Sequence, residues 1–216
     1  MNTPINSPLQ RYESRIVHKK LTLIAAIALT LLAALLALSL GSINLSVGEV
    51  LQTLLGGGSA ASQTVIGDIR LPRIIAAILV GAILAVSGAV MQCVLNNPLA
   101  SASTLGVSQG AAFGAALGII VFGGGVINSG AASVAVEINN TYIVTLCAFL
   151  FGSLSTIVII ILSRLKKTLG ANGLILAGVA LSSLFTGGST LLQYFADETK
   201  ISAVVFWTFG NLGSAS

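Results

Sequence analysis

The polar side chains best placed to do chemistry form a short series near the end of the sequence. One helix would carry them as a narrow stripe, because they fall at i, i+4, i+8, i+11 and i+15: Gly178, Ser182, Thr186, Ser189 and Gln193. Their hydroxyl and amide groups could line a pathway for a polar solute. Ser and Thr can equally bond to the carbonyl four residues earlier, which would make the stripe a helix contact.

Groups for covalent or metal chemistry are scarce. Cys93 and Cys147 lie inside apolar runs, and their spacing suits neither a metal site nor a redox pair, so we expect them to pack as small hydrophobic side chains. The sequence has no Gly-x-x-x-x-Gly-Lys-Ser/Thr phosphate loop. We therefore predict no catalytic residue, no metal ligand and no bound cofactor, with ATP and Mg²⁺ held by a partner if ATP drives the process.

The composition assigns the chain to a membrane. Hydrophobic residues make up 55% of the 216 residues, charged residues only 7%, and the mean hydropathy is +1.00. Soluble domains carry about 25% charged residues. The net charge of +4 comes from basic residues beside apolar runs, so topology explains it better than a nucleic-acid partner does.

The apolar runs predict an all-α, polytopic transmembrane helix bundle. Five runs are read as crossings, and a sixth is too short to cross: 21–40, 71–95, 108–122, 142–163 and 173–194, followed by 201–209. We divide the chain into a cytoplasmic segment, 1–20, and a membrane domain, 21–216. The first run is longer than a signal-peptide core, which favours a retained helix.

Local signals fill the gaps between crossings. Ser46 and Glu49 predict a capping box, followed by a short amphipathic helix at the membrane surface. Residues 56–62 and 123–132 are read as Gly- and Ser-rich turns, and Pro72 as a first-turn proline of the second crossing. With the N-terminus inside, seven Lys and Arg residues are cytoplasmic and three external: Arg11, Arg15, Lys19, Lys20, Arg164, Lys166 and Lys167, against Arg70, Arg73 and Lys200.

Arg70 and Arg73 stand where membrane proteins seldom place cations. They lie on the predicted external side and at the predicted start of a helix, where the macrodipole disfavours positive charge. They could meet carboxylates on a docking protein, or else lipid headgroups or Asp68. Apart from Arg73, the five crossings contain no ionisable Asp, Glu, Lys, Arg or His, which weakens any proton- or sodium-driven mechanism.

Small residues recur at every third or fourth position in the second crossing, and at every fourth position in the third crossing and just before it. Such series let helices approach closely in lipid, so tight packing is the favoured interpretation and a part in solute passage the alternative: Gly81, Ala85 and Gly88 in one, and Gly106, Gly110, Gly114 and Gly118 in the other.

Several motifs together resemble one family. They are Arg-Leu-Pro-Arg at 70–73, Gly-Ala at 81–82, Ser-Gly-Ala-Val-Met-Gln at 87–92, Asn-Pro-Leu-Ala at 97–100 and Leu-Gly-Val-Ser-Gln-Gly-Ala at 105–111, with weaker matches at 176–181 and 206–210. From about residue 21 onward, the chain resembles permeases of ATP-binding-cassette importers for ferric siderophores, haem and cobalamin (FecCD/BtuC-like).

The resemblance implies a set of partners and roles. It implies a homodimer in the inner membrane that works with cytoplasmic ATPase subunits and an external substrate-binding protein, without chemistry on the solute. Arg70 and Arg73 would then dock glutamates of the binding protein. Asn97 and Leu99 would lie at a cytoplasmic gate, and a loop at Ala171 and Asn172 at a second one.

Two questions stay open at the level of sequence. Family chains continue well past the position of Ser216, so we expect this sequence to be C-terminally truncated. The solute is expected to be a ferric siderophore, with haem, cobalamin or molybdate as alternatives. An ion-coupled carrier and a non-transporting membrane scaffold are the competing classes.

Overall fold

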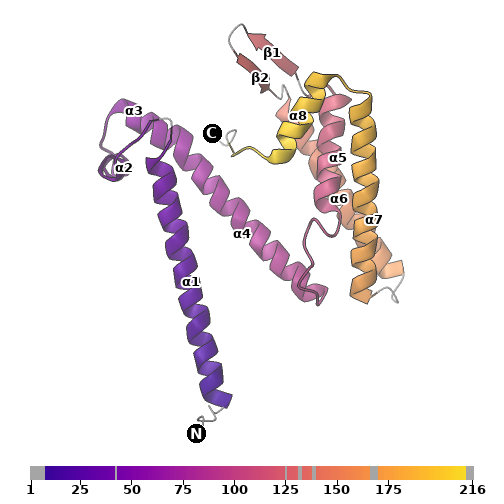
Figure 1. Cartoon of the computed structure of the whole chain (residues 1–216), viewed down its shortest axis with the longest axis horizontal. Coiled ribbons are helices and arrows are strands. Elements are labelled where there is room, and N and C mark those ends of the chain that lie inside the picture. The colour runs from indigo at the N-terminus through magenta and orange to yellow at the C-terminus, as the bar shows by residue number, and fades with distance from the viewer. Residues whose placement is uncertain are drawn as a thin grey trace, which may run out of the picture. The chain divides into compact units, whose positions relative to one another are not determined.

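The computed structural model describes residues 8–41, 43–124, 126–130, 133–137, 140–165 and 170–212 (Figure 1). Within these ranges the chain is helical apart from one short β-hairpin, so the predicted all-α, polytopic architecture is confirmed. The described residues fall into two units, one reaching to Leu79 with Leu212 added, and one spanning Val80–Asn211. Each unit is described by itself.

The first unit begins with a long helix, α1, at Pro8–Ser39. The apolar run predicted at 21–40 is confirmed as a candidate membrane span, which begins at Ile16 and ends at Ser39. The predicted cytoplasmic segment is helical from Pro8 onward and continues into the span without a break. Residues 1–7 lie outside the described part of the chain.

The predicted capping box is confirmed at the start of α2, Val47–Leu54. The Ser46 hydroxyl accepts the Glu49 N–H at 3.2 Å, and the Glu49 carboxylate accepts the Ser46 N–H at 2.8 Å. These hydrogen bonds, that from the Ser46 backbone above all, lower the pKa of Glu49 below its ordinary value. One side of this short helix is buried, at Val50.

The second crossing starts much earlier than predicted. Residues 56–62 are not all turn, because α3, Ala60–Gln63, begins inside them behind the N-cap Ser59. It continues through a π-helix, η1, at Thr64–Arg70 into α4 at Leu71–Val94, giving 35 continuous helical residues.

The placement of Pro72 in a first turn is therefore wrong. A proline inside a helix cannot donate to the carbonyl four residues back, and its ring crowds that carbonyl. The π-helix directly before it widens the turn, and the Leu71 N–H reaches back five residues to Ile66. Wider backbone spacing at this point lets the helix pass the proline and continue.

A small core holds the first unit together. Leu38 of α1, Val50 of α2 and Ile66 of η1 are each at most 5% exposed, and Leu45 and Ile74 pack against them. Three segments thus meet at the end of α1.

The second unit contains the end of α4 and four further helices. They are α5 at Val107–Ile120, α6 at Thr141–Leu165, α7 at Gly170–Tyr194 and α8 at Glu198–Phe209. The predicted crossings at 142–163 and 173–194 are confirmed as the candidate spans α6 and α7. α8 has 12 residues, about 18 Å at 1.5 Å per residue, so it is too short to cross, as predicted.

The predicted third crossing is shorter than a full span. α5 has 14 residues, about 21 Å of helix against a hydrocarbon core of about 30 Å, and four longer helices elsewhere in the described chain are the candidate spans. α5 lies among α6, α7 and α8 and contacts all three (Figure 1). This enclosure explains how a short apolar helix is accommodated.

α5 is also the centre of the core. Ala115, Ala116 and Ile119 are fully buried against α6 and α8. Three phenylalanines from three helices meet beside them: Phe113 lies 5.0 Å from Phe151 and 5.6 Å from Phe185 between ring centroids. The Phe113–Phe151 contact is edge-on and the Phe113–Phe185 contact is tilted, and an edge-on pair is worth about 0.5–1.5 kcal/mol beyond area burial.

A β-hairpin replaces part of the turn predicted at 123–132. Strand β1, Val126–Gly130, pairs antiparallel with β2, Ser133–Glu137, so that Val126 lies opposite Glu137. β2 follows the predicted turn and alternates Val134 and Val136 with smaller or polar residues, a β-type pattern for which no element was predicted. The hairpin lies beside α8 (Figure 1).

Candidate functional site: a polar face on α5 and α7

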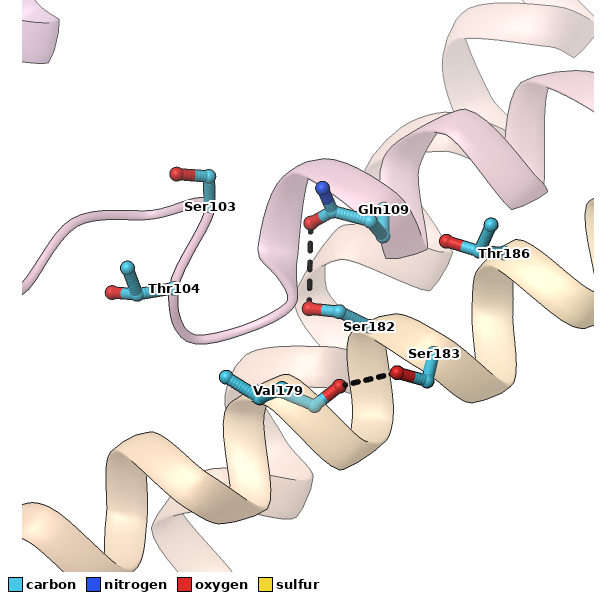
Figure 2. A pocket seen from close by; sticks show the side chains of 7 residues that line it. All are labelled: Ser103, Thr104, Gln109, Val179, Ser182, Ser183 and Thr186. Carbon is cyan, nitrogen blue, oxygen red and sulfur yellow. Dashed lines mark hydrogen bonds between the residues drawn. The ribbon is translucent and has the colours of Figure 1, made fainter.

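The polar stripe of α7 faces a cavity that it shares with the entry of α5 (Figure 2). The cavity is a wide-open groove and not an enclosed space; it measures about 570 Å³ and is lined by Ser103, Thr104, Gln109, Val179, Ser182, Ser183 and Thr186. The Ser182 hydroxyl donates to the Gly178 carbonyl of its own helix at 2.9 Å and lies 3.5 Å from the Gln109 side-chain oxygen across the cavity, and the Ser183 hydroxyl donates to the Val179 carbonyl of its own helix at 3.0 Å (Figure 2). The stripe thus makes the helix contacts that its spacing allows and also faces the cavity.

A second cavity continues the same face toward α8. It measures about 380 Å³ and is lined by Ser108, Gln109, Ala112, Thr186, Ser189, Gln193, Val204, Trp207 and Thr208. Gln109 and Thr186 line both cavities, so the two form one stretch of surface. Every lining polar group is a hydroxyl, an amide or the Trp207 indole N–H, and none is charged. Such a surface can hydrogen-bond a solute without holding it through a charge.

A tight turn just before α5 positions the residues that α5 and its entry contribute to this polar face. Residues 102–106 form a single turn that ends at Gly106, whose φ of 80° is in the left-handed region that glycine adopts without strain. The Val107 N–H reaches back to the Ala102 carbonyl at 3.1 Å, closing the turn, and α5 begins at Val107. Ser103 and Thr104 thereby come to the mouth of the cavity beside Gln109.

Gly178 does not line either cavity, although it begins the predicted stripe. It is buried, and a Cβ at this position would collide with the Thr104 carbonyl oxygen and would lie 2.7 Å from the Leu105 Cα. Gly178 lies where the backbone of α7 touches the backbone of the turn before α5, at Thr104 and Leu105. Ser182, Thr186, Ser189 and Gln193 are the stripe residues that reach the cavities.

The glycine series of α5 lies against the backbone of α6. A Cβ on Gly110 would approach the Phe151 carbonyl oxygen to 2.8 Å, one on Gly114 would collide with the Cys147 carbonyl, and one on Gly118 would lie 3.0 Å from the Val144 Cα. Gly106, the first of the series, lies against α7 at Gly178. Absent side chains let these helices touch directly.

The small residues of α4 have no such neighbour in the described chain. A Cβ on Gly81 or Gly88 would meet no atom within 4 Å, and Ala85 is exposed. Their predicted packing role is therefore not fulfilled within the described residues of this chain and stays a prediction for contacts outside them.

The first predicted gate is an ordered turn. Asn96, with φ of 46°, ends α4, and the N–H groups of Asn96 and Asn97 return to the Cys93 and Gln92 carbonyls. The Asn97 side-chain oxygen then accepts the Leu99 N–H at 2.9 Å across Pro98, an Asx turn. Leu99 is 77% exposed at its tip. The gate role of Asn97 and Leu99 stays a prediction.

The second predicted gate is not a loop. α7 begins at Gly170, so Ala171 and Asn172 lie in its first turn, the former half-buried and the latter exposed. Helix-favouring residues follow directly after Gly173, and the helix extends backward past that glycine.

Arg70 occupies a site that sequence reasoning did not foresee. Its guanidinium donates to three main-chain carbonyls at and after the end of α1, those of Leu38, Ser39 and Ile43. Because the helix containing Arg70 starts at Ala60, neither Arg70 nor Arg73 lies at a helix N-terminus, and that part of the prediction is wrong. Arg73 is exposed one turn further along.

Lys200 has a similar environment in the second unit. From the first turn of α8, its ammonium group donates to the Ile120 carbonyl at the end of α5, at 3.1 Å. The macrodipole of α5 favours this cation at its C-terminus, whereas the macrodipole of α8 disfavours it in the first turn of that helix, so the bond to the Ile120 carbonyl supplies the compensation. Arg70 and Lys200, both predicted to be external, are thus bound to carbonyls at or near helix ends.

Comparison with known proteins assigns the family. The FecCD transport family matches residues 29–216, which is most of the chain. The chain belongs to the FecCD transport family. As a FecCD chain with several apolar spans, it is a multi-pass protein of the inner membrane.

Curated relatives of this FecCD chain carry transporter names. It is 50% identical over 185 residues to a protein named as an ABC transporter permease, MJ0087 of Methanocaldococcus jannaschii, covering 85% of this chain and 52% of that protein. It is 34% identical to the molybdate import permease MolB of Haemophilus influenzae (87% and 53% covered) and to the vitamin B12 import permease BtuC of Vibrio parahaemolyticus (82% and 49%).

A solved structure agrees with this FecCD assignment. It is described as an inward-facing conformation of a metal-chelate type ABC transporter and matches with a TM-score of 0.69 at 34% identity, covering 89% of this chain and 54% of that one. The chain spans about half the length of the relatives it matches.

Sequence reasoning missed one side of the polar face of this FecCD chain. The turn before α5 contributes Ser103 and Thr104, and the first turn of α5 contributes Ser108 and Gln109. α8 contributes Trp207 and Thr208. The signal available was the motif at 105–111, where Ser108 and Gln109 interrupt an apolar run. Which side they faced depended on the turn at Gly106.

Proposed function

We propose that this chain forms part of the permease of an ATP-binding-cassette importer, and that the polar face of α5 and α7 lines the route of a polar chelate. The observation that supports this most directly is the uncharged, hydrogen-bonding lining of two adjoining cavities. A pathway that binds its solute weakly lets the solute leave again. Energy would come from ATP hydrolysed by a separate cytoplasmic subunit.

The solute class we propose is a ferric-siderophore-type chelate. Chelation masks the metal charge and surrounds it with oxygen and nitrogen atoms that hydroxyl and amide groups can recognise. A bare oxyanion such as molybdate would be held better by Arg or Lys, and a bare cation by carboxylates, and neither lines the cavities. Cobalamin and haem are further chelates that the same lining would suit.

The remaining partners follow from the family. We propose a second permease copy, an external substrate-binding protein, cytoplasmic ATPases and surrounding lipid. Arg73 is the proposed docking residue on the predicted external side, since it is exposed. Arg70 could join it only if its guanidinium left the three carbonyls that it binds.

The proposal is tested by uptake in cells that express the complete native chain. Thr186→Leu puts apolar bulk where both cavities meet, while Thr190→Leu makes the same change one turn later on α7, outside both linings. We expect Thr186→Leu to lower uptake roughly tenfold, about 1.4 kcal/mol on the barrier, and Thr190→Leu to leave it near normal. Equal effects would remove the pathway assignment.

The solute and the energy source are tested with the same cells. Radiolabelled ferric siderophore, haem, cobalamin and molybdate are offered in turn, and the partner ATPase is deleted. Uptake of one label that stops without the ATPase supports the importer. Uptake that survives the deletion but stops when the ion gradient is dissipated would show an ion-coupled carrier, and no uptake of any label would favour a scaffold.

A further inference from the structure

Arg70 is tied to the end of α1 and the residues after it by three hydrogen bonds. One guanidinium nitrogen donates to the Leu38 carbonyl at 2.5 Å and to the Ser39 carbonyl at 3.2 Å, and the other terminal nitrogen donates to the Ile43 carbonyl at 2.5 Å. Leu38 and Ser39 are the last two residues of α1. Their carbonyls have no partner within the helix, because an α-helix leaves its last four carbonyls unpaired.

The chemistry of these contacts is favourable on two counts. Arg presents five N–H donors in a rigid, planar fork, so a single side chain can serve several carbonyls at once. Its positive charge lies at the negative end of the α1 macrodipole. Arg70 is half-buried there, while Arg73 is exposed.

The neighbouring backbone is shaped to admit the guanidinium. A Cβ on Gly41 would lie 2.5 Å from the Arg70 Nη2 and 3.0 Å from its Cζ, so the side chain fills the space that any larger residue would need. The Leu45 N–H also returns to the Ser39 carbonyl at 3.1 Å, and the Ser39 hydroxyl donates to the Leu45 carbonyl at 2.6 Å. The chain around Gly41 and Leu45 is thus folded back onto the helix end where Arg70 sits.

We propose that Arg70 is a positioning residue that locks the end of α1 to η1 and so fixes the connection from α1 to α2. It would act on docking only indirectly, by setting the place of this connection and of Arg73 one turn further along the helix. The indirect part rests on the proposed function, whereas the local part rests on the hydrogen bonds alone.

The test is a double-mutant cycle on the complete native chain in lipid nanodiscs, with no binding protein present. Amide hydrogen exchange is followed in the peptide covering residues 38–46. We expect Arg70→Ala to speed exchange there roughly tenfold, since hydrogen bonds to charged groups are among the stronger ones. Arg70→Lys restores part of the protection, because a lysine can reach a carbonyl but lacks the fork.

Gly41→Ala provides the matched change from the opposite side. Its new Cβ displaces the guanidinium, so exchange rises as in Arg70→Ala, but the double variant is no worse than Arg70→Ala because the displaced group is already gone. Unaltered exchange in Arg70→Ala, or effects of the two changes that multiply in the double variant, would overturn the proposal.

Uptake by the same variants separates this inference from the proposed function. If Arg70 positions the connection, Arg70→Ala and Gly41→Ala lower uptake together, and Arg70→Lys recovers it in step with its recovered protection. A defect in Arg70→Ala that Gly41→Ala does not share would show direct docking and refute the positioning role. Absent uptake in the unaltered protein would count against the proposed function and leave the exchange result standing.

Discussion

The contact between α5 and α6 makes a quantitative prediction at Gly114. A Cβ there would collide with the Cys147 carbonyl, and it would lie 2.7 Å from the Cys147 carbonyl carbon and 3.0 Å from the Ala148 Cα. All three atoms belong to the backbone of α6, which cannot rotate away as a side chain can. Gly114→Ala must therefore push two helices apart.

The size of the effect follows from two opposing terms. Overpacking a close-packed site costs about 1–3 kcal/mol. Ala gains about 0.5–1 kcal/mol over Gly inside a helix, which offsets part of that cost. Gly81→Ala makes the identical change in α4, where a Cβ meets no atom of the described residues within 4 Å, so within this part of the chain it carries the helix gain alone. The difference between the two variants isolates overpacking, and we expect it to be about 1–3 kcal/mol.

The assay is reversible unfolding of the complete native chain in mixed micelles, followed by circular dichroism at increasing denaturing detergent. The free energy of unfolding of Gly118→Ala should fall between those of Gly114→Ala and Gly81→Ala, since a Cβ at Gly118 would lie 3.0 Å from its closest backbone neighbour, the Val144 Cα. If Gly114→Ala unfolds within about 0.5 kcal/mol of Gly81→Ala, the range of an ordinary surface change, then α5 and α6 are not in backbone contact and the reasoning fails.

Two further predictions concern charges at helix ends. Lys200→Gln removes the cation from the Ile120 carbonyl and should lower the free energy of unfolding by about 0.3–1 kcal/mol in the same assay. Lys200→Arg keeps the charge and should keep most of this stability. An equal loss in both variants would show that charge is not the cause. The pKa of Glu49 is lowered by its bonds to Ser46, so the capping box is stabilised above the ordinary carboxyl pKa and weakens as pH falls through the lowered one. Exchange in the peptide 46–50 should therefore, after correction for intrinsic rates, rise at acid pH in the unaltered chain and stay flat in Glu49→Gln, and parallel profiles would refute this.

Features set by short-range patterns could be predicted from the sequence. The α1, α6 and α7 spans follow from runs of apolar residues long enough to cross a bilayer, and the capping box at Ser46 and Glu49 from residues three apart. The family followed from motifs such as that at 70–73, and the polar stripe of α7 from helical spacing. Each of these signals lies within one element and needs no partner to be read.

The features missed were set by contacts between distant segments or by a local departure from regular helix. The π-turn before Pro72 carried the second helix back to Ala60, against a proline rule that holds for regular α-helices. Whether Gly178 or Ser182 faces the cavity depended on the turn that ends at Gly106, because this turn packs the Thr104 backbone against Gly178. A stripe on one helix says which residues share a face and leaves open what that face meets.

Arg70 and Lys200 show the same difference between what the sequence determines and what only the tertiary structure decides. The sequence singled out Arg70 as a cation placed against the charge rule and counted Lys200 among the external basic residues. Only the tertiary structure decided what binds these cations, because the accepting carbonyls lie 32 residues from Arg70 at Leu38 and 80 residues from Lys200 at Ile120. Backbone carbonyls are identical at every residue, so a sequence carries no mark of which one ends a helix beside a distant cation.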